Sequence, residues 1–223
     1  MRAEADPCGL VILNGDLMNT ALRNSVSDVY GELMSPMQQI SHMVDLLRPL
    51  ANKIIGVTAG NHENRVYRND GIDTTRLVCR ELGIEDRYAP EGVLIFLHFG
   101  TRNGHGRHKD KSTKQWYSIY ATHGSGGGRK EGAKAIRLAD MAATVDADVY
   151  IHSHTHLPMV MKEAYFRTNP ANCSVCLVPK LFINTGAALE YGGYGQAQEF
   201  KPSSIDTPVI RLDAATKQMS ATL

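Results

Sequence analysis

The chain has 223 residues, of which 43% are hydrophobic and 21% are charged, and its formal net charge is +1. These values are typical of a globular protein with one large core, and so small a net charge excludes a general electrostatic attraction to nucleic acid or to an anionic membrane. No apolar run is long enough to span a membrane, and the first residues lack the charged-then-apolar order of a secretory signal. We therefore expect one domain over residues 1–223, in the cytoplasm and without a membrane partner.

The first half of the sequence alternates short apolar runs with longer amphipathic segments, which predicts strands and helices in turn. Residues 9–14 (GLVILN) and 53–59 (KIIGVTA) are predicted to be strands. A helix is predicted over residues 26–50, where apolar side chains recur at helical spacing and Pro36 marks a break or a kink. A second helix is predicted around residues 74–83, where it ends at a glycine.

The second half of the sequence is richer in strands. The elements expected there are, in order, strands over 93–99 and 116–122 on either side of a polar loop at 100–115, a helix over 131–145, a strand over 148–153, and mostly strands and turns from Pro158 onward. This mixture of helices and strands indicates the α/β or α+β class.

The four cysteines are too few and too scattered for a disulfide framework, so we expect reduced thiols at Cys8, Cys79, Cys173 and Cys176. Cys173 and Cys176 form a lone C-x-x-C. This pair is compatible with half of a structural zinc site or with a redox pair, but the sequence shows neither a second pair nor a helix that opens at Cys173. A hairpin with two reduced thiols is the favoured interpretation.

Polar side chains that can bind a metal or a proton follow four of the predicted strands. They are Asp16, then Asn61 and His62, then His123, and finally His154 and His156. Open α/β sheets place their ligands at the carboxyl ends of strands, and nearby glycines, Gly15 and Gly60, allow sharp turns there. Carboxylate, amide oxygen and imidazole together suit Mn, Fe, Zn, Ni or Co rather than a soft metal in a thiolate site.

In this order the residues resemble the motifs of the calcineurin-like metallophosphoesterases, which are D-x-H, G-D, G-N-H-[DE], a histidine, and G-H-x-H. The sequence matches four of the five, as GD at 15–16, GNHE at 60–63, His123, and SHTH at 153–156. The resemblance implies a two-sheet β-sandwich flanked by helices, around two divalent metal ions. By resemblance the metal ligands are Asp16 as the bridge, Asn61, His123 and His154 at one ion, and His156 at the other.

The resemblance also implies a reaction, the metal-dependent hydrolysis of phosphoester bonds by a hydroxide held between the two ions. Asn61 and His62 are the implied catalytic residues, because Asn61 offers an oxygen without added charge and His62 contacts the phosphate and protonates the leaving group. Glu63 or another nearby carboxylate is expected to orient His62. The alternative, from a different class, is a non-catalytic scaffold or binding protein with a degraded metal site.

Two departures from the family motifs bear on this choice. Ser153 stands where the family has glycine, which keeps a small residue. The more serious departure is that no Asp-x-His occurs in the sequence, and only 14 residues precede Gly15. We therefore expect that the first βα unit is missing, that the ion at His156 lacks two ligands, and that one tightly held metal remains. An exposed edge beside residues 9–14 is then expected to favour association between chains.

Single histidines and charged runs have simpler explanations. His42, His98 and His152 are more readily explained as hydrogen-bonded core residues than as ligands, and Asp16 taken alone would be a turn residue. Residues 101–114 contain five Lys or Arg and one Asp. This basic loop either grips a nucleic acid or another phosphorylated substrate, or is simply solvated. Basic residues also follow His123, at Arg129, Lys130 and Lys134, after a GSGGG run that lacks the Lys and Ser/Thr of a P-loop.

Overall fold

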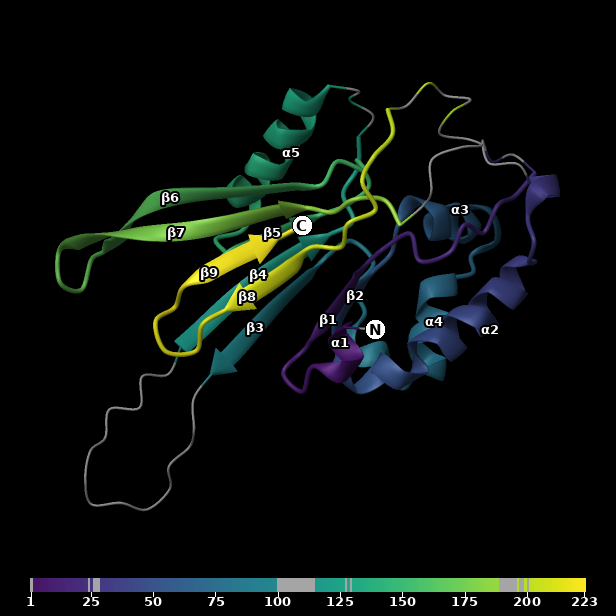
Figure 1. Cartoon of the computed structure of the whole chain (residues 1–223), viewed down its shortest axis with the longest axis horizontal. Helices are drawn as coiled ribbons and strands as arrows, with labels where there is room; N and C mark the ends of the chain where they lie inside the picture. Colours follow the sequence, from purple (N-terminus) through teal and green to yellow (C-terminus); the bar gives the residue numbers. More distant parts are fainter. Residues whose placement is uncertain are drawn as a thin grey trace, which may run out of the picture.

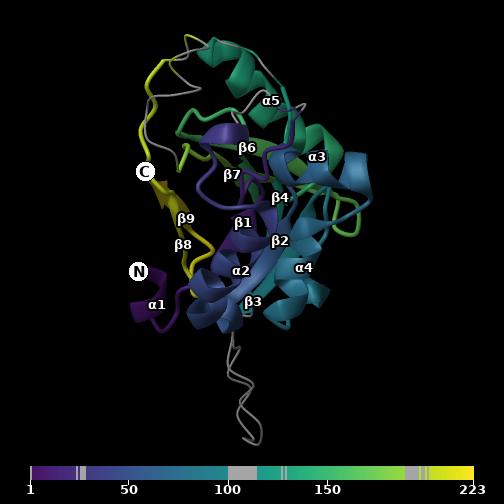
Figure 2. The same ribbon diagram turned by 90° about the vertical axis from the view of Figure 1, so that its right-hand side faces the viewer.

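The computed structural model describes residues 2–23, 25, 29–99, 115–126, 128, 130–188, 196, 199 and 201–223. They form an α/β fold in which two β-layers face each other and helices cover both outer sides (Figures 1 and 2). This arrangement confirms the predicted fold class. In the described residues, no helix is both long and apolar enough to cross a membrane.

The first β-layer contains a pair of parallel strands, β1 (Val11–Asn14) and β2 (Ile54–Thr58). Because they are parallel, with Asn14 opposite Thr58, their carboxyl ends meet at one edge. In the part of the chain described, β2 is the only strand that pairs with β1. A separate antiparallel hairpin is formed by β8 (Val209–Leu212) and β9 (Met219–Thr222).

The second β-layer is one five-stranded sheet in the order β3-β4-β5-β7-β6. Its strands are β3 (Val93–Phe99), β4 (Gln115–Thr122), β5 (Val149–His152), β7 (Ser174–Asn184) and β6 (Met159–Asn169). The central strands β4, β5 and β7 are parallel, so that Thr122, His152 and Asn184 are aligned at the same edge. The outer strands β3 and β6 run antiparallel to their neighbours.

The helices on the outer side of β1 and β2 enclose one hydrophobic core, which contains Val44, Leu47, Ile54 and Val57. A second core lies between the two β-layers, and α5 packs on β5 and β7 through a third. The helical elements are α1 (Arg2–Ala5), η1 (Val29–Gly31), α2 (Pro36–Leu47), η2 (Arg48–Lys53), α3 (Asn61–Asp70), α4 (Thr74–Glu81), η3 (Glu85–Arg87) and α5 (Glu131–Thr144).

The main errors of the sequence-based assignment concern helices. The helix expected from residue 26 begins instead at Pro36, because Ser35 caps it together with Gln38 and proline suits the first helical position. Helix α3 was not predicted at all. Its signal was the spacing of Gly60 and Glu63, since Glu63 accepts the backbone N–H of Gly60 as in a capping box. The strands and α5 differ from the expected ranges by two residues or fewer.

Cys79 belongs to a hydrophobic core, whereas the other three cysteines lie at the surface. All four are free thiols, and Cys79 is buried while Cys8, Cys173 and Cys176 are exposed. Cys173 occupies the turn between β6 and β7, and Cys176 lies opposite Arg167 in the hairpin.

Candidate metal centre

Four of the strand ends meet where the two β-layers face each other. Asp16 follows β1, Asn61 opens α3 after β2, His123 comes directly after β4, and His154 follows β5. The side chain of Asn14 connects the layers, because its amide donates to the carbonyl of Thr122 at 2.8 Å and to Ser153 Oγ at 2.7 Å. These bonds hold the ends of β1, β4 and β5 together.

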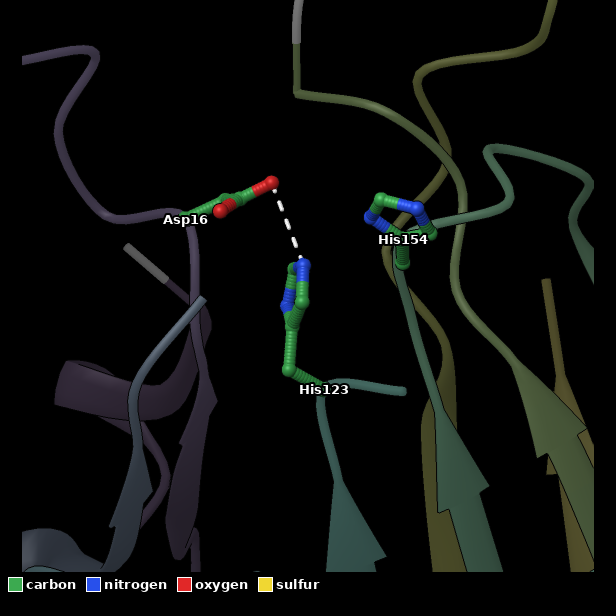
Figure 3. Close-up of side chains that lie close together, drawn as sticks. All are labelled: Asp16, His123 and His154. Carbon is green, nitrogen blue, oxygen red and sulfur yellow. Dashed lines mark ion pairs between the residues drawn. The ribbon is translucent and has the colours of Figure 1, made fainter. Parts of the chain in front are cut away.

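The donor atoms of these four side chains converge. His123 Nε2 lies 3.2 Å from Asp16 Oδ2 and 3.2 Å from Asn61 Oδ1, and His154 Nδ1 lies 2.8 Å from Asn61 Oδ1. Figure 3 shows Asp16, His123 and His154 directed into one space. Two ligands of one ion, each bound at about 2.1 Å, lie about 3.0 to 3.4 Å apart. Two of the three separations lie in this range and the one between His154 and Asn61 is slightly shorter, so the donor set fits a divalent ion after a small adjustment of His154.

The donor atoms can converge because three residues have left-handed φ angles and because two positions are glycine. Gly15 and Asp16 both have positive φ, and a Cβ on Gly15 would lie 2.6 Å from His123 Nδ1. A Cβ on Gly60 would lie 2.0 Å from Asp16 Oδ1, so only glycine fits there. His154 also has positive φ, because β5 has already ended at His152. The two histidines of the H-x-H motif thus lie in the turn that follows β5.

The expectation that Glu63 or another nearby carboxylate orients His62 is wrong for Glu63, which instead holds two of the turns together. Its buried carboxylate accepts backbone N–H groups from Asp16 at 3.0 Å, Met18 at 2.9 Å and Gly60 at 2.9 Å. Burial raises the pKa of Glu63, and the N–H donors of Met18 and Gly60 oppose that rise. Glu63 therefore fixes the backbone that presents Asp16.

His62 is held by a closed ring of hydrogen bonds that no sequence motif indicated. Its Nδ1 lies 2.7 Å from Asn19 Oδ1, and Asn19 donates to Glu32. Gln39 also donates to Glu32, at 2.9 Å, and accepts the N–H of Thr20 at 2.9 Å. Thr20 Oγ1 closes the ring by donating to the carbonyl of His62. An amide oxygen only accepts, so His62 Nδ1 carries the proton and Nε2 faces Asp16, 3.9 Å from Oδ2.

The electrostatics of the centre favour the metal-binding forms of Asp16 and His154 but not that of His123. Burial by itself would raise the pKa of Asp16, but hydrogen bonding and charge from His123 outweigh it and lower that pKa to about 2. Burial lowers the pKa of His62 and of His154, which favours the neutral form of each ring. Burial alone would lower the pKa of His123, but the hydrogen bond and the charge of Asp16 outweigh burial and raise that pKa. His123 Nδ1 donates to the carbonyl of Asn14 at 2.7 Å, so Nε2 is the nitrogen that faces the centre.

His156 lies outside this cluster of donors. It is exposed, and Asp16, His123 and His154 form the only group of three or more His, Cys, Asp or Glu donors found among the described residues. The expected core role is wrong for His42 and His98, which are both exposed. It holds for His152, which is buried against Asn184, with Nδ1 2.9 Å from Oδ1.

Only some of the basic residues named from the sequence lie among the described residues. Residues 101–114 and Arg129 lie outside the described residues. Lys130 precedes α5 as its N-cap, and Lys134 donates from Nζ to the carbonyl of Thr155 at 2.7 Å. Lys134 thus brings a positive charge to the turn that carries His154 and His156.

Comparison with known proteins agrees with this geometry. The sequence model of the calcineurin-like phosphoesterase family matches residues 3–158, well over half of the chain. The matched range includes Asp16, Asn61, His123 and His154, together with all the strands that position them. Searches of curated proteins and of solved structures found no significant match. The chain belongs to the calcineurin-like phosphoesterase family.

Proposed function

We propose that the chain hydrolyses phosphoester bonds with the help of a divalent metal ion, and that its substrates are phosphodiesters or nucleotides. The observation that carries this proposal is the convergence of Asp16, Asn61, His123 and His154, each from a different strand end, at donor separations that suit one ion. Asn61 is exposed, so water and a substrate reach the centre from its side. Mn, Fe, Zn, Ni and Co all accept this donor set.

A bound ion would supply Lewis-acid polarisation of the phosphate and a lowered pKa for attacking water. The residues of the chain do the rest. Asp16, His123 and His154 would hold the ion with one negative charge among them, which would leave the centre attractive to a phosphate. His62 presents Nε2 beside Asp16, and in the doubly protonated form of the ring this nitrogen would donate a proton to the leaving-group oxygen. Lys134 adds positive charge at the rim.

The centre is proposed to hold one ion tightly. Four side chains contribute to the cluster, whereas a second ion would rely on Asp16 and His156, and metal affinity falls with fewer fixed ligands. Activity that needs two ions would then require a high metal concentration. The free thiols of Cys8, Cys173 and Cys176 are exposed, which is compatible with the proposal of a cytoplasmic location.

The test is metal content and hydrolysis measured on the same preparation. Elemental analysis of the purified chain after dialysis against Mn is expected to give about one ion per chain by the ligand count. Hydrolysis of bis(p-nitrophenyl) phosphate is expected to depend on added Mn. It is expected to be lost in Asp16→Asn but not in the control His42→Ala, which changes an exposed histidine of α2. Metal uptake without hydrolysis of any phosphoester would favour the non-catalytic alternative, and absence of metal would overturn both parts of the proposal.

A further inference from the structure

The turn that carries the two histidines of the H-x-H motif, residues 153–156 and here called the histidine turn, has an unusual backbone. The φ angle is 62° at His154 and 54° at His156, so both residues are left-handed. Residues other than glycine rarely adopt this region, and they persist in it only where the surrounding structure fixes them. Thr155 stands between the two histidines and is buried. The bonds that fix Thr155 therefore decide where the ring of His154 is directed.

The five-stranded sheet holds the histidine turn at its beginning and at its end. At the beginning, Ser153 donates its N–H to the carbonyl of His123 at 3.1 Å. At the end, Asn184 of β7 donates from Nδ2 to Thr155 Oγ1 at 2.7 Å and to the carbonyl of Leu157 at 2.6 Å. These bonds fix the side chain of Thr155, but they do not reach its carbonyl oxygen.

The carbonyl of Thr155 is held from outside the sheet, by Lys134 of α5. Lys134 Nζ donates to it at 2.7 Å, and the lysine side chain is half-buried. Among the hydrogen bonds of the described residues, Lys134 is the only partner of this oxygen. The neighbouring carboxylate on the helix, Glu131, pairs instead with Lys201 at 2.9 Å. The ammonium group therefore makes a charge-assisted hydrogen bond to the turn, which is stronger than a bond between neutral groups.

We propose that Lys134 is a positioning residue of the metal centre, whose bond to the Thr155 carbonyl keeps His154 directed at the ion. This carbonyl belongs to the peptide plane that joins Thr155 to His156, between the two left-handed residues. Without the bond that plane can rotate and the backbone on either side can relax. His154 Nδ1 then loses its place 2.8 Å from Asn61 Oδ1, where the donors converge.

The inference rests on the proposed metal centre, and it assigns a role to α5, a helix that carries none of the four donors. Two other roles for Lys134 give different results. A lysine that only attracts the phosphate of a substrate would change the KM and leave the affinity for the ion unchanged. A lysine that only stabilises the fold would lower the free energy of unfolding and change neither the KM nor the affinity for the ion.

The experiment is a calorimetric titration of Mn into the full chain after EDTA has been removed by dialysis. Lys134→Met keeps the length of the side chain but has no donor, and it is expected to weaken Mn binding by about 10- to 100-fold, the usual effect of losing a group that orients a ligand. Lys134→Arg keeps a charged donor and is expected to restore most of the affinity. The matched control is Lys162→Met, because Lys162 of β6 also donates to a backbone carbonyl, that of Met219 at 3.1 Å. This control is expected to bind Mn as the wild-type chain does.

Unchanged Mn affinity in Lys134→Met, an equal loss in Lys162→Met, or no recovery in Lys134→Arg would each overturn the proposal. Because Lys134 is only half-buried, circular dichroism in EDTA is expected to show Lys134→Met folded. An unfolded variant would assign the bond to the fold and would also overturn the proposal. Weaker Mn binding in a chain that hydrolyses no phosphoester would leave this inference standing while the proposed function fails. Hydrolysis of bis(p-nitrophenyl) phosphate with unchanged Mn affinity in Lys134→Met would do the reverse.

Discussion

Removal of His154 is expected to abolish most of the stabilisation that a metal ion gives to the fold. His154 supplies one of four converging donors and contacts Asn61 Oδ1 at 2.8 Å. The variant His154→Ala leaves the other three donors in place, and two of them, Asp16 and His123, are fixed by bonds that do not involve His154. The fold should persist while the affinity for the ion falls.

The size of the effect follows from mass action. At a free metal concentration about 100 times the dissociation constant, binding stabilises the folded state by about 2.7 kcal/mol. For a chain of this length each kcal/mol raises the melting temperature by about 2 to 4 °C, so the wild-type protein should gain about 5 to 10 °C. If the lost ligand weakens binding about 100-fold, the same metal concentration stabilises the variant by only about 0.4 kcal/mol, or about 1 °C.

The assay is thermal unfolding in EDTA and in excess Mn, with two controls. His42→Ala changes an exposed histidine on α2 and should keep the full metal-dependent shift. His156→Ala should also keep most of it, because His156 lies outside the converging donors. A full shift in His154→Ala, or an equal loss in His156→Ala, would refute the assignment of the tight site.

Further predictions concern the residues around the centre and one buried thiol. His62→Ala should lower turnover by about two to four orders of magnitude with unchanged metal content, and Asn19→Ala by a part of that; loss of metal in either would show a ligand role. Glu63→Ala should lower the free energy of unfolding by about 3 kcal/mol or more in urea, because three N–H groups lose their acceptor, whereas exposed Glu81→Ala should not. Burial raises the pKa of Cys79 from 9.0 to about 12, so three thiols should react with a disulfide reagent at pH 8 before unfolding and four afterwards. Since the folded state keeps that proton, stability should fall as pH rises from about 9 to 12, less so in Cys79→Ala.

The strands were predictable from local sequence, and the cluster of donors from the order of motifs along the chain. Residues 93–99 alternate inward and outward side chains, and that period of two is a local signal of a strand. The cluster was predictable from the order of motifs, because parallel strands bring their carboxyl ends to one edge whatever the intervening helices do. Asp16 and His123 follow strands of different β-layers, so their contact across more than a hundred residues also depends on how the two layers pack.

Other features depend on contacts between distant segments, which the sequence does not display. Glu63 looked like a carboxylate beside His62, yet on a helix adjacent residues face different directions, and its side chain turns to Asp16 and Gly60. Glu32 precedes His62 by 30 residues and no motif connects the two. The sequence therefore did not indicate that Glu32 belongs to the hydrogen-bond ring. His98 resembled a core residue only because its neighbours in sequence are apolar.

The four donors differ in how firmly they are fixed before any ion binds, and this difference explains why one tight site is expected. Asp16 is held at its backbone by Glu63, and its Oδ1 accepts the N–H of His62 at 3.0 Å. His123 is anchored through Nδ1 on a carbonyl. Fixed donors lose little freedom on binding, so most of their interaction with an ion appears as affinity. An ion placed at exposed His156 would have only Asp16 as a fixed partner, and would bind after the cluster is filled.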